Sequence, residues 1–180
     1  MTYSIVYSTR TGNTGLLAET IKNALPAEGC AYIGAPCPEG GMADLVFAGF
    51  WTDKGSCSEE LREFLIGLRD KQVFLFGTAG FGGAPEYFSR ILTQVSQLLD
   101  SSNTVAGTYM CQGKMQQAVR SRYEAMLEQN PGDDKVLGMI SNFDMALMHP
   151  DDGDLQRLAL EVKGLLSQSD QPGLPATDAL

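Results

Sequence analysis

Ser8-Thr9-Arg10-Thr11-Gly12-Asn13-Thr14 is the stretch that decides the fold of this chain. It directly follows an apolar run over Tyr3–Tyr7 and overlaps the start of a helix-period segment over Asn13–Ala24. Hydroxyl groups, a glycine and an asparagine between a strand and a helix can donate several hydrogen bonds to an anion, and the helix N-terminus adds partial positive charge. The stretch therefore predicts a cradle for a phosphate.

The kind of phosphate follows from what the stretch lacks. It has neither the lysine of a nucleotide-hydrolysing phosphate loop nor a G-x-G-x-x-G pattern. A mostly neutral, hydroxyl-rich cradle suits one phosphate monoester better than a triphosphate with its magnesium. The alternative interpretation is a serine- and threonine-rich capping turn of no chemical importance.

The stretch resembles the phosphate-binding loop of flavodoxins, T-x-T-G-x-T. Thr9, Thr11, Gly12 and Thr14 match this loop in register, and Arg10 fills the variable position. The resemblance covers most of residues 3–115 and implies a flavodoxin-like fold that binds riboflavin 5′-phosphate (FMN).

Bulk properties exclude several classes of function. A chain of 180 residues is predicted to form one domain, residues 1–168, followed by a mobile C-terminal tail over residues 169–180. The net charge of −9 and the pI near 4.5 argue against a nucleic-acid partner. The same acidity suits docking onto a basic patch of a protein partner, or serves only solubility.

Cellular location and metal content are also constrained. The chain shows no signal peptide and no apolar run near the roughly 20 residues that span a bilayer, so no membrane is expected. Four cysteines without a C-x-x-C pair and one histidine make a metal site improbable and favour a cytoplasmic protein with free thiols.

Apolar runs and helix-period segments alternate along the chain. The predicted strands are Tyr3–Tyr7, Cys30–Gly34, Leu45–Gly49, Val73–Gly77 and Val105–Met110. The predicted helices are Asn13–Ala24, Ser58–Leu68, Pro85–Leu99, Met115–Gln129 and Asp151–Leu166. Ser56 and Glu59 have the spacing of a capping box for the second helix. Residues 131–150 are left as a long connection whose shape the pattern does not give.

This alternation predicts an α/β three-layer sandwich around a parallel sheet. The order 2-1-3-4-5 for the five strands is the flavodoxin arrangement, with ligands beyond the carboxyl ends of the central strands. Two further loops then lie beside the phosphate loop. The loop Gly49–Gly55 holds Trp51, which can stack on a planar ring, and the loop Gly77–Ala84 holds four glycines whose amides can approach a ring edge.

The flavodoxin resemblance implies a set of FMN-binding residues in these three loops. They are Thr9, Arg10, Thr11, Gly12, Asn13 and Thr14 around the phosphate, then Phe50, Trp51, Thr52 and Asp53 on one side of the ring, and Thr78, Ala79, Gly80 and Phe81 on the other. No catalytic residue is assigned. Alternatives stay open for two aromatics: Trp51 could close the core at the sheet end, and Phe81 could lie apart from the flavin.

One position departs from the family pattern. Many flavodoxins have glycine where Thr52 stands, and there a peptide turns its carbonyl toward flavin N5 when one electron is added. A threonine at positive φ would cost roughly 1 kcal/mol or more, so one-electron reduction should be less favoured and paired-electron transfer becomes plausible. Lys54 could offset the charge of a reduced flavin or project into solvent.

A narrower resemblance rests on three segments: Gly49–Gly55, the turn Cys111–Lys114, and His149-Pro150-Asp151. These are similar to the small flavodoxin-family proteins of anaerobic gut bacteria, including the BilS type that accompanies bilirubin reductase. This resemblance implies electron supply to a larger flavin or iron–sulfur reductase. Gln112 and Lys114 would lie near the flavin rim or the partner, or form a polar turn.

Two functions compete. The first is a non-covalent FMN protein that shuttles electrons from a donor reductase or ferredoxin-like donor to an acceptor reductase. The second is an NAD(P)H-dependent FMN quinone or flavin reductase. A phosphorylation-controlled receiver module on the same topology would need an aspartate at the end of the third strand and a lysine at the end of the fifth. Gly49 and Met110-Cys111 stand there instead.

Overall fold

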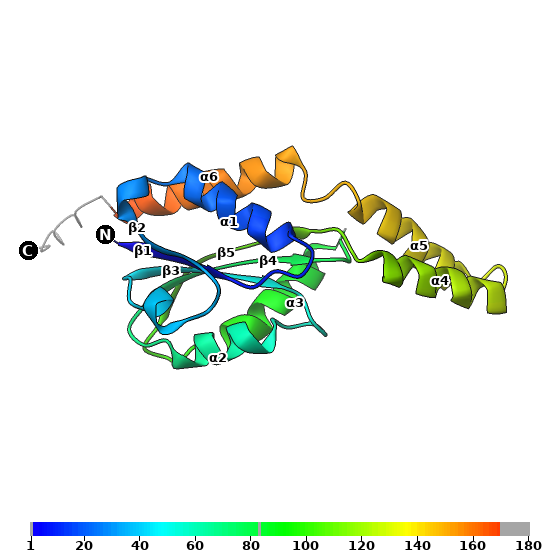
Figure 1. Ribbon diagram of the computed structural model, residues 1–180, viewed down its shortest axis with the longest axis horizontal. Coiled ribbons are helices and arrows are strands. Elements are labelled where there is room, and N and C mark those ends of the chain that lie inside the picture. The colour runs from blue at the N-terminus through cyan, green and yellow to red at the C-terminus, as the bar shows by residue number, and fades with distance from the viewer. Residues whose placement is uncertain (1, 83, 170–180) are drawn as a thin grey trace, which may run out of the picture.

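A single parallel sheet organises the molecule (Figure 1). The structure is a computed structural model that describes residues 2–82 and 84–169. The strands are β1 (Tyr3–Tyr7), β2 (Cys30–Gly34), β3 (Leu45–Trp51), β4 (Gln72–Ala79) and β5 (Thr104–Gln112). Every neighbouring pair is parallel, and the order β2-β1-β3-β4-β5 confirms the predicted topology.

Helices cover both faces of the sheet. The longer ones are α1 (Asn13–Ala24), α2 (Glu59–Gly67), α3 (Pro85–Ser96), α4 (Gln117–Gln129), α5 (Asp134–Ala146) and α6 (Asp152–Ser169), and short 3-10 turns occupy η1 (Ala27–Gly29) and η2 (Pro38–Gly41). Helices α1 and α6 lie side by side on one face, while α2 and α3 cover the other. This arrangement is the predicted three-layer sandwich.

Two apolar cores result, one on each side of the sheet. Along β3, Leu45 and Phe47 point toward α1 and α6, whereas Val46, Ala48 and Phe50 point toward α2 and α3. All five side chains are fully buried. Alternating side chains that are all apolar are what a strand covered on both faces requires, and they fix the register of the sheet.

The structure corrects two details of the helix prediction. Helix α2 begins at Glu59 with Ser58 as its N-cap, so the Ser56 capping box is wrong. The backbone of Ser56 instead pairs with Asp53 in a tight turn. Helix α6 runs to Ser169, three residues beyond the predicted Leu166, and the rest of the expected mobile tail lies outside the described residues.

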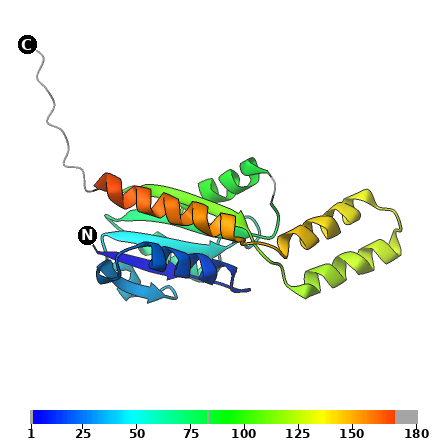
Figure 2. The ribbon, with the colours of Figure 1, turned by 90° about the horizontal axis from the view of Figure 1, so that it is seen from above.

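Residues 131–150, whose shape the sequence pattern left open, contain a helix. Asp133 caps α5 by accepting hydrogen bonds from the backbone N–H groups of Lys135 and Val136. The new helix packs against α4, so the two form a helical hairpin. Figures 1 and 2 show this hairpin projecting beyond the end of the sheet where α1 begins, which is the carboxyl end of the strands.

The two ends of the helical hairpin meet at its base. The backbone N–H of Lys114 donates to the carbonyl of His149 at 3.1 Å. Asp151 and Asp154 then cap α6 reciprocally, each carboxylate accepting the other residue's backbone N–H at 2.8 and 3.0 Å. His149 Nδ1 lies 2.6 Å from the buried Asp154 carboxylate, so the chain is held firmly where it rejoins the sandwich.

Among the described residues, no helix combines the length and the apolar character needed to cross a bilayer.

Candidate functional site

The phosphate-loop stretch turns directly from β1 into α1 through a left-handed glycine. Gly12 has φ +85°, and its carbonyl accepts the first helical hydrogen bond from Leu16 at 3.0 Å. The Gly12 backbone N–H donates a hydrogen bond to the Thr9 hydroxyl oxygen at 3.1 Å. A Cβ built on Gly12 would meet nothing within 4 Å, so glycine is required here by the backbone conformation and not by lack of space.

Two side chains of this loop turn inward. The Asn13 amide donates to the Thr11 hydroxyl and to the Lys114 carbonyl, both at 2.9 Å. The fully buried Thr14 hydroxyl lies 3.4 Å from that of Thr78 on β4. The loop is therefore tied both to the base of the helical hairpin and to the strand that carries the third loop.

The second loop is a short antiparallel turn at the end of β3. Asp53 and Ser56 exchange backbone hydrogen bonds at 2.8 and 2.9 Å around Lys54 and Gly55, which have φ +48° and +84°. Two successive residues with positive φ are the signature of a type I′ turn. The positive φ thus falls at Lys54 and not at Thr52, and the Lys54 side chain is exposed.

Thr52 itself is tethered to the neighbouring strand. Its backbone N–H and its hydroxyl both donate to the Thr78 carbonyl, each at 2.9 Å. The next N–H, that of Asp53, donates to Ser56. A rotation of the peptide between Thr52 and Asp53 would break this last bond, so the peptide is held in one orientation.

Trp51 lies at the carboxyl end of β3 and is partly exposed. The guanidinium carbon of Arg10 lies 5.2 Å from the centroid of its ring, in cation–π geometry. A planar ring that stacked on this face would displace Arg10 toward the phosphate loop. The sequence predicted a ring contact for Trp51 and a phosphate contact for Arg10. The structure places these two side chains next to each other.

The third loop leaves β4 and is held by β5 and the helical hairpin. The backbone N–H of Gly113 donates to the Ala79 carbonyl at 2.9 Å. The next carbonyl, that of Gly80, accepts from the side chains of Gln112 and Asn142. Loops far apart in the sequence therefore converge at one edge of the sheet.

A cavity of about 140 Å³ lies between these loops. It is lined by Arg10, Thr11, Asn13, Trp51, Thr52, Thr78, Ala79, Gly80, Gly113, Lys114, Met115, Gln116 and Val119. The charged members among these lining residues, Arg10 and Lys114, are both positive, although the chain as a whole carries −9. A cavity with hydroxyls, glycines, one indole and positive charge suits an anionic ligand with a flat aromatic part.

Eight of the predicted FMN-binding residues line this cavity, and six do not. Thr9, Gly12, Thr14, Asp53 and Phe81 lie outside its lining; Thr9 and Gly12 shape the phosphate loop from the backbone side. Phe50 is placed elsewhere: its side chain is fully buried in the core beneath α2 and α3. It alternates with Trp51 on β3, and successive side chains of a strand point to opposite faces.

Sequence reasoning missed the contribution of the helical hairpin to the cavity. Gly113, Met115, Gln116 and Val119 all line it, yet only Gln112 and Lys114 had been placed near the rim. The available signal was the rule that parallel strands end at one edge, which brings the residues after β5 to the same place as the other loops.

Burial makes two of the four thiols unreactive. Burial raises the pKa of the Cys57 thiol and raises the pKa of Cys111 to about 12, and both side chains are buried. A thiol that stays protonated at neutral pH is a poor nucleophile. Cys111 therefore serves as a packed apolar residue of β5 beneath the cavity.

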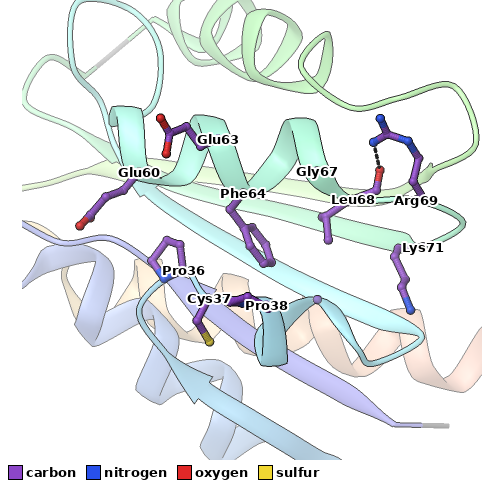
Figure 3. Close-up of a pocket in the computed structure, with 11 residues that line it drawn as sticks. Pro36, Cys37, Pro38, Glu60, Glu63, Phe64, Gly67, Leu68, Arg69 and Lys71 are labelled. Carbon is purple, nitrogen blue, oxygen red and sulfur yellow. Dashed lines mark hydrogen bonds between the residues drawn. The ribbon is translucent and has the colours of Figure 1, made fainter.

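A larger cavity of about 610 Å³ lies away from this edge, between α2 and the segment that precedes β3 (Figure 3). Phe64 points from α2 toward Pro38 across it, and Leu68, directly after the helix, faces Gly41 of the same segment. The Lys71 ammonium donates to the Met42 carbonyl at 3.1 Å, and Arg69 donates to the Leu68 carbonyl at 2.7 Å. Its two cations therefore already have carbonyl partners, and its other charged lining residues, Glu60 and Glu63, are acidic, which does not suit an anionic ligand.

Curated relatives cover most of the chain. A flavodoxin-like domain-containing protein BilS of Clostridium symbiosum (strain WAL-14163) is 41% identical over an alignment of 173 residues, and the match covers 86% of this chain and 90% of the relative. The BilS protein of Clostridioides difficile (strain CD3) is 26% identical over 166 residues, covering 90% and 94%. These similarities confirm the narrower resemblance to the BilS type.

Solved structures agree with the fold. The Streptococcus pneumonia TIGR4 flavodoxin superposes with a TM-score of 0.59 at 13% identity, covering 93% of this chain and 99% of that one. Oxidised Flavodoxin 2 from Bacillus cereus gives a TM-score of 0.58 at 16% identity, with coverage of 93% and 99%. A family model described as a flavodoxin domain matches residues 4–163. The chain therefore belongs to the flavodoxin family, whose cofactor is FMN.

Proposed function

We propose that this protein is an electron carrier that holds FMN in the cavity at the carboxyl edge of the sheet and delivers electrons to a partner reductase. One observation carries the proposal: the phosphate loop, Trp51 and the third loop, called the Gly80 loop below because Gly80 begins it after β4, converge on one cavity. The charged residues that line this cavity are both cationic. Bound FMN supplies the redox chemistry, because it accepts and releases one or two electrons.

Each loop has a separate task in this proposal. The left-handed Gly12 directs backbone N–H groups at the start of α1 toward the phosphate, and the Thr11 hydroxyl and Arg10 add donors. Trp51 stacks on the ring system and shields it from water on one face. Gly80 brings the backbone of the third loop to the ring edge, and a side chain at this position would collide with Met115.

The partner is a redox protein that reaches the flavin from the open carboxyl edge. The acidic surface of the chain favours a partner whose docking face is basic, with association that weakens as salt increases. We name a reductase as the acceptor because the resemblance to the BilS type, stated in the sequence analysis, implies electron supply to one. A donor reductase or a ferredoxin-like protein would reload the carrier.

Tryptophan fluorescence provides a direct test, because Trp51 is the one tryptophan of the chain. Titrating flavin-free protein with FMN should quench its emission to saturation at one equivalent, and riboflavin should bind far more weakly because it lacks the phosphate. Equal binding of FMN and riboflavin would contradict the phosphate anchor. An unchanged emission with no FMN in the purified protein would contradict the proposed function.

A second candidate is an NAD(P)H-dependent FMN quinone or flavin reductase, and the tethered Thr52 peptide favours it because that geometry suits paired electrons. Steady-state oxidation of NAD(P)H by the FMN-loaded protein alone separates the two. A carrier should show no turnover until a donor reductase is added, whereas a reductase turns over without one.

A further inference from the structure

The Gly80 carbonyl sits in a three-part amide cluster. It accepts a hydrogen bond from Gln112 Nε2 at 3.0 Å and another from Asn142 Nδ2 at 3.0 Å. Gln112 Nε2 also donates to Asn142 Oδ1 at 3.1 Å. Asn142 is only 9% exposed, and its amide donor and acceptor are both satisfied within the cluster.

The loop that Gly80 begins passes through a narrow space. A Cβ on Gly80 would lie 2.4 Å from Cγ of Met115, and a Cβ on Gly82 would lie 2.6 Å from Oε1 of Gln112. Gly113 is similarly close to Asn13, whose Nδ2 would lie 2.5 Å from an added Cβ. The base of the helical hairpin is therefore in tight contact with both the Gly80 loop and the phosphate loop.

The amide cluster acts on the cavity through the backbone. Gly80 lines the cavity, but neither Asn142 nor Gln112 is part of its lining. Asn142 comes from α5, 62 positions away from Gly80 in the sequence. Any effect of the Asn142 side chain on a ligand in the cavity must therefore pass through the position of the Gly80 carbonyl and the peptide groups that follow it.

We propose that Asn142 is a positioning residue for the FMN site: its amide, together with Gln112, fixes the Gly80 loop in the conformation that meets the edge of the flavin ring. The proposal rests on the proposed function and goes beyond it, because it assigns a role in cofactor binding to the helical hairpin. A loop fixed before the ligand arrives loses less conformational freedom on binding, which raises affinity.

A purely structural role is the competing explanation, in which the cluster merely fastens the helical hairpin to the sandwich. The two explanations predict different affinities for FMN and different absorbance spectra of bound FMN. A fastening role predicts altered unfolding and unaltered flavin binding by the folded protein. A positioning role predicts weaker FMN binding and an absorbance spectrum of bound FMN closer to that of free FMN, because the contact with the ring edge is looser.

The experiment compares Asn142→Asp and Asn142→Ala with Ser141→Ala. Asn142→Asp is nearly isosteric and can still accept from Gln112, but it cannot donate to the Gly80 carbonyl; Asn142→Ala removes both bonds. Ser141 is the adjacent, exposed residue of α5 and serves as the matched control. FMN affinity is measured by quenching of Trp51 emission, the bound spectrum by absorbance, and folding by thermal unfolding of each flavin-free variant.

Both Asn142 variants should bind FMN at least about tenfold more weakly than parent and control, equivalent to about 1.4 kcal/mol. Affinities within twofold of the control, with an unshifted spectrum, would overturn the proposal and leave the proposed function intact. A parent protein that binds no FMN would overturn both. If neither Asn142 variant folds, Gln112→Ala removes the other donor to Gly80 and carries the same expectation.

Discussion

At the scale of single residues, Thr52 is the position for which we predict an effect on the electron chemistry of the bound flavin. Two donors of this residue, its N–H and its hydroxyl, converge on the Thr78 carbonyl, and the following N–H of Asp53 is bonded to Ser56. The sequence predicted a cost from positive φ at this position. In the structure Thr52 does not have positive φ. The expected penalty on one-electron reduction therefore rests on the hydrogen bonds that hold this peptide, not on backbone strain.

Thr52→Gly should loosen this peptide, although the Asp53 bond to Ser56 stays available, and should increase the fraction of one-electron-reduced flavin at half reduction. Glycine removes the hydroxyl bond and permits positive φ at no steric cost. Thr52→Ser keeps the hydroxyl donor and should behave like the parent. Anaerobic redox titration followed by EPR gives the fraction for each variant. Equal fractions in Thr52→Gly and the parent would show that the tether does not control electron pairing.

Gly12→Val should weaken FMN binding at least tenfold. A β-branched residue at φ +85° costs roughly 1–2 kcal/mol or more, so the loop would move away from the conformation that cradles a phosphate. Gly12→Asn is the matched control, because asparagine tolerates the left-handed region and the added Cβ meets no neighbour. Fluorescence titration measures both. Parent-like binding by Gly12→Val would place the phosphate elsewhere.

At the scale of single elements, β5 illustrates how burial sets chemistry. The chain reaches the cavity lining directly after this strand, at Gly113, while Cys111 and Tyr109 of the strand itself point into the core beside α6. The Tyr109 hydroxyl donates to the Asp154 carbonyl at 2.6 Å, and burial raises the pKa of both Tyr109 and Cys111. Neither group should ionise while the protein is folded at neutral pH.

The free energy of unfolding should therefore fall as pH rises above 9. The Cys111 thiol ionises near its ordinary pKa of 9.0 in the unfolded chain but only near about 12 in the folded one. Across this window the unfolded state holds fewer protons, so alkali favours unfolding. Urea unfolding at several pH values should show a shallower decline for Cys111→Ala than for the parent. Identical slopes would mean that this thiol is not buried as described.

At the scale of the whole molecule, the helical hairpin is a separate lobe. Neither of the two sandwich cores includes a buried residue between 113 and 150. The lobe has its own small core, which includes Tyr123, Val136 and Phe143. Its exposed apolar side chains, among them Met145 at 58% and Met148 at 74%, lie beyond the sandwich.

Replacing residues 116–147 by a short glycine turn should leave the sandwich folded but weaken FMN binding. The ends can be joined because Lys114 N–H lies 3.1 Å from the His149 carbonyl. Cooperative thermal unfolding and far-UV circular dichroism test the first expectation, and FMN titration tests the second. Loss of all cooperative unfolding would show that the lobe is needed for the fold.

Features of the fold that depend on adjacent residues could be predicted from the sequence, and features that depend on distant residues could not. The turn from β1 into α1 at Gly12 was predicted correctly because strand, glycine and helix are adjacent in the chain. Helix α5 escaped prediction because its apolar residues do not mark one buried face: Val136 and Phe143 are buried, whereas Leu137 and Met145 are exposed. Phe50 was misassigned because its position beside Trp51 suggested a shared role, whereas strand alternation sends neighbours to opposite faces.

The sequence by itself determined the alternation of strands and helices, the two covered faces of the sheet and the turn from strand to helix at Gly12, because each follows from runs of adjacent residues. The flavodoxin resemblance implied the order of the five strands, and the structure confirms it. Only the tertiary structure decided that α5 returns to the cavity and that Asn142 meets Gly80. That contact joins residues 62 positions apart through side-chain geometry, which no local pattern of hydrophobicity encodes.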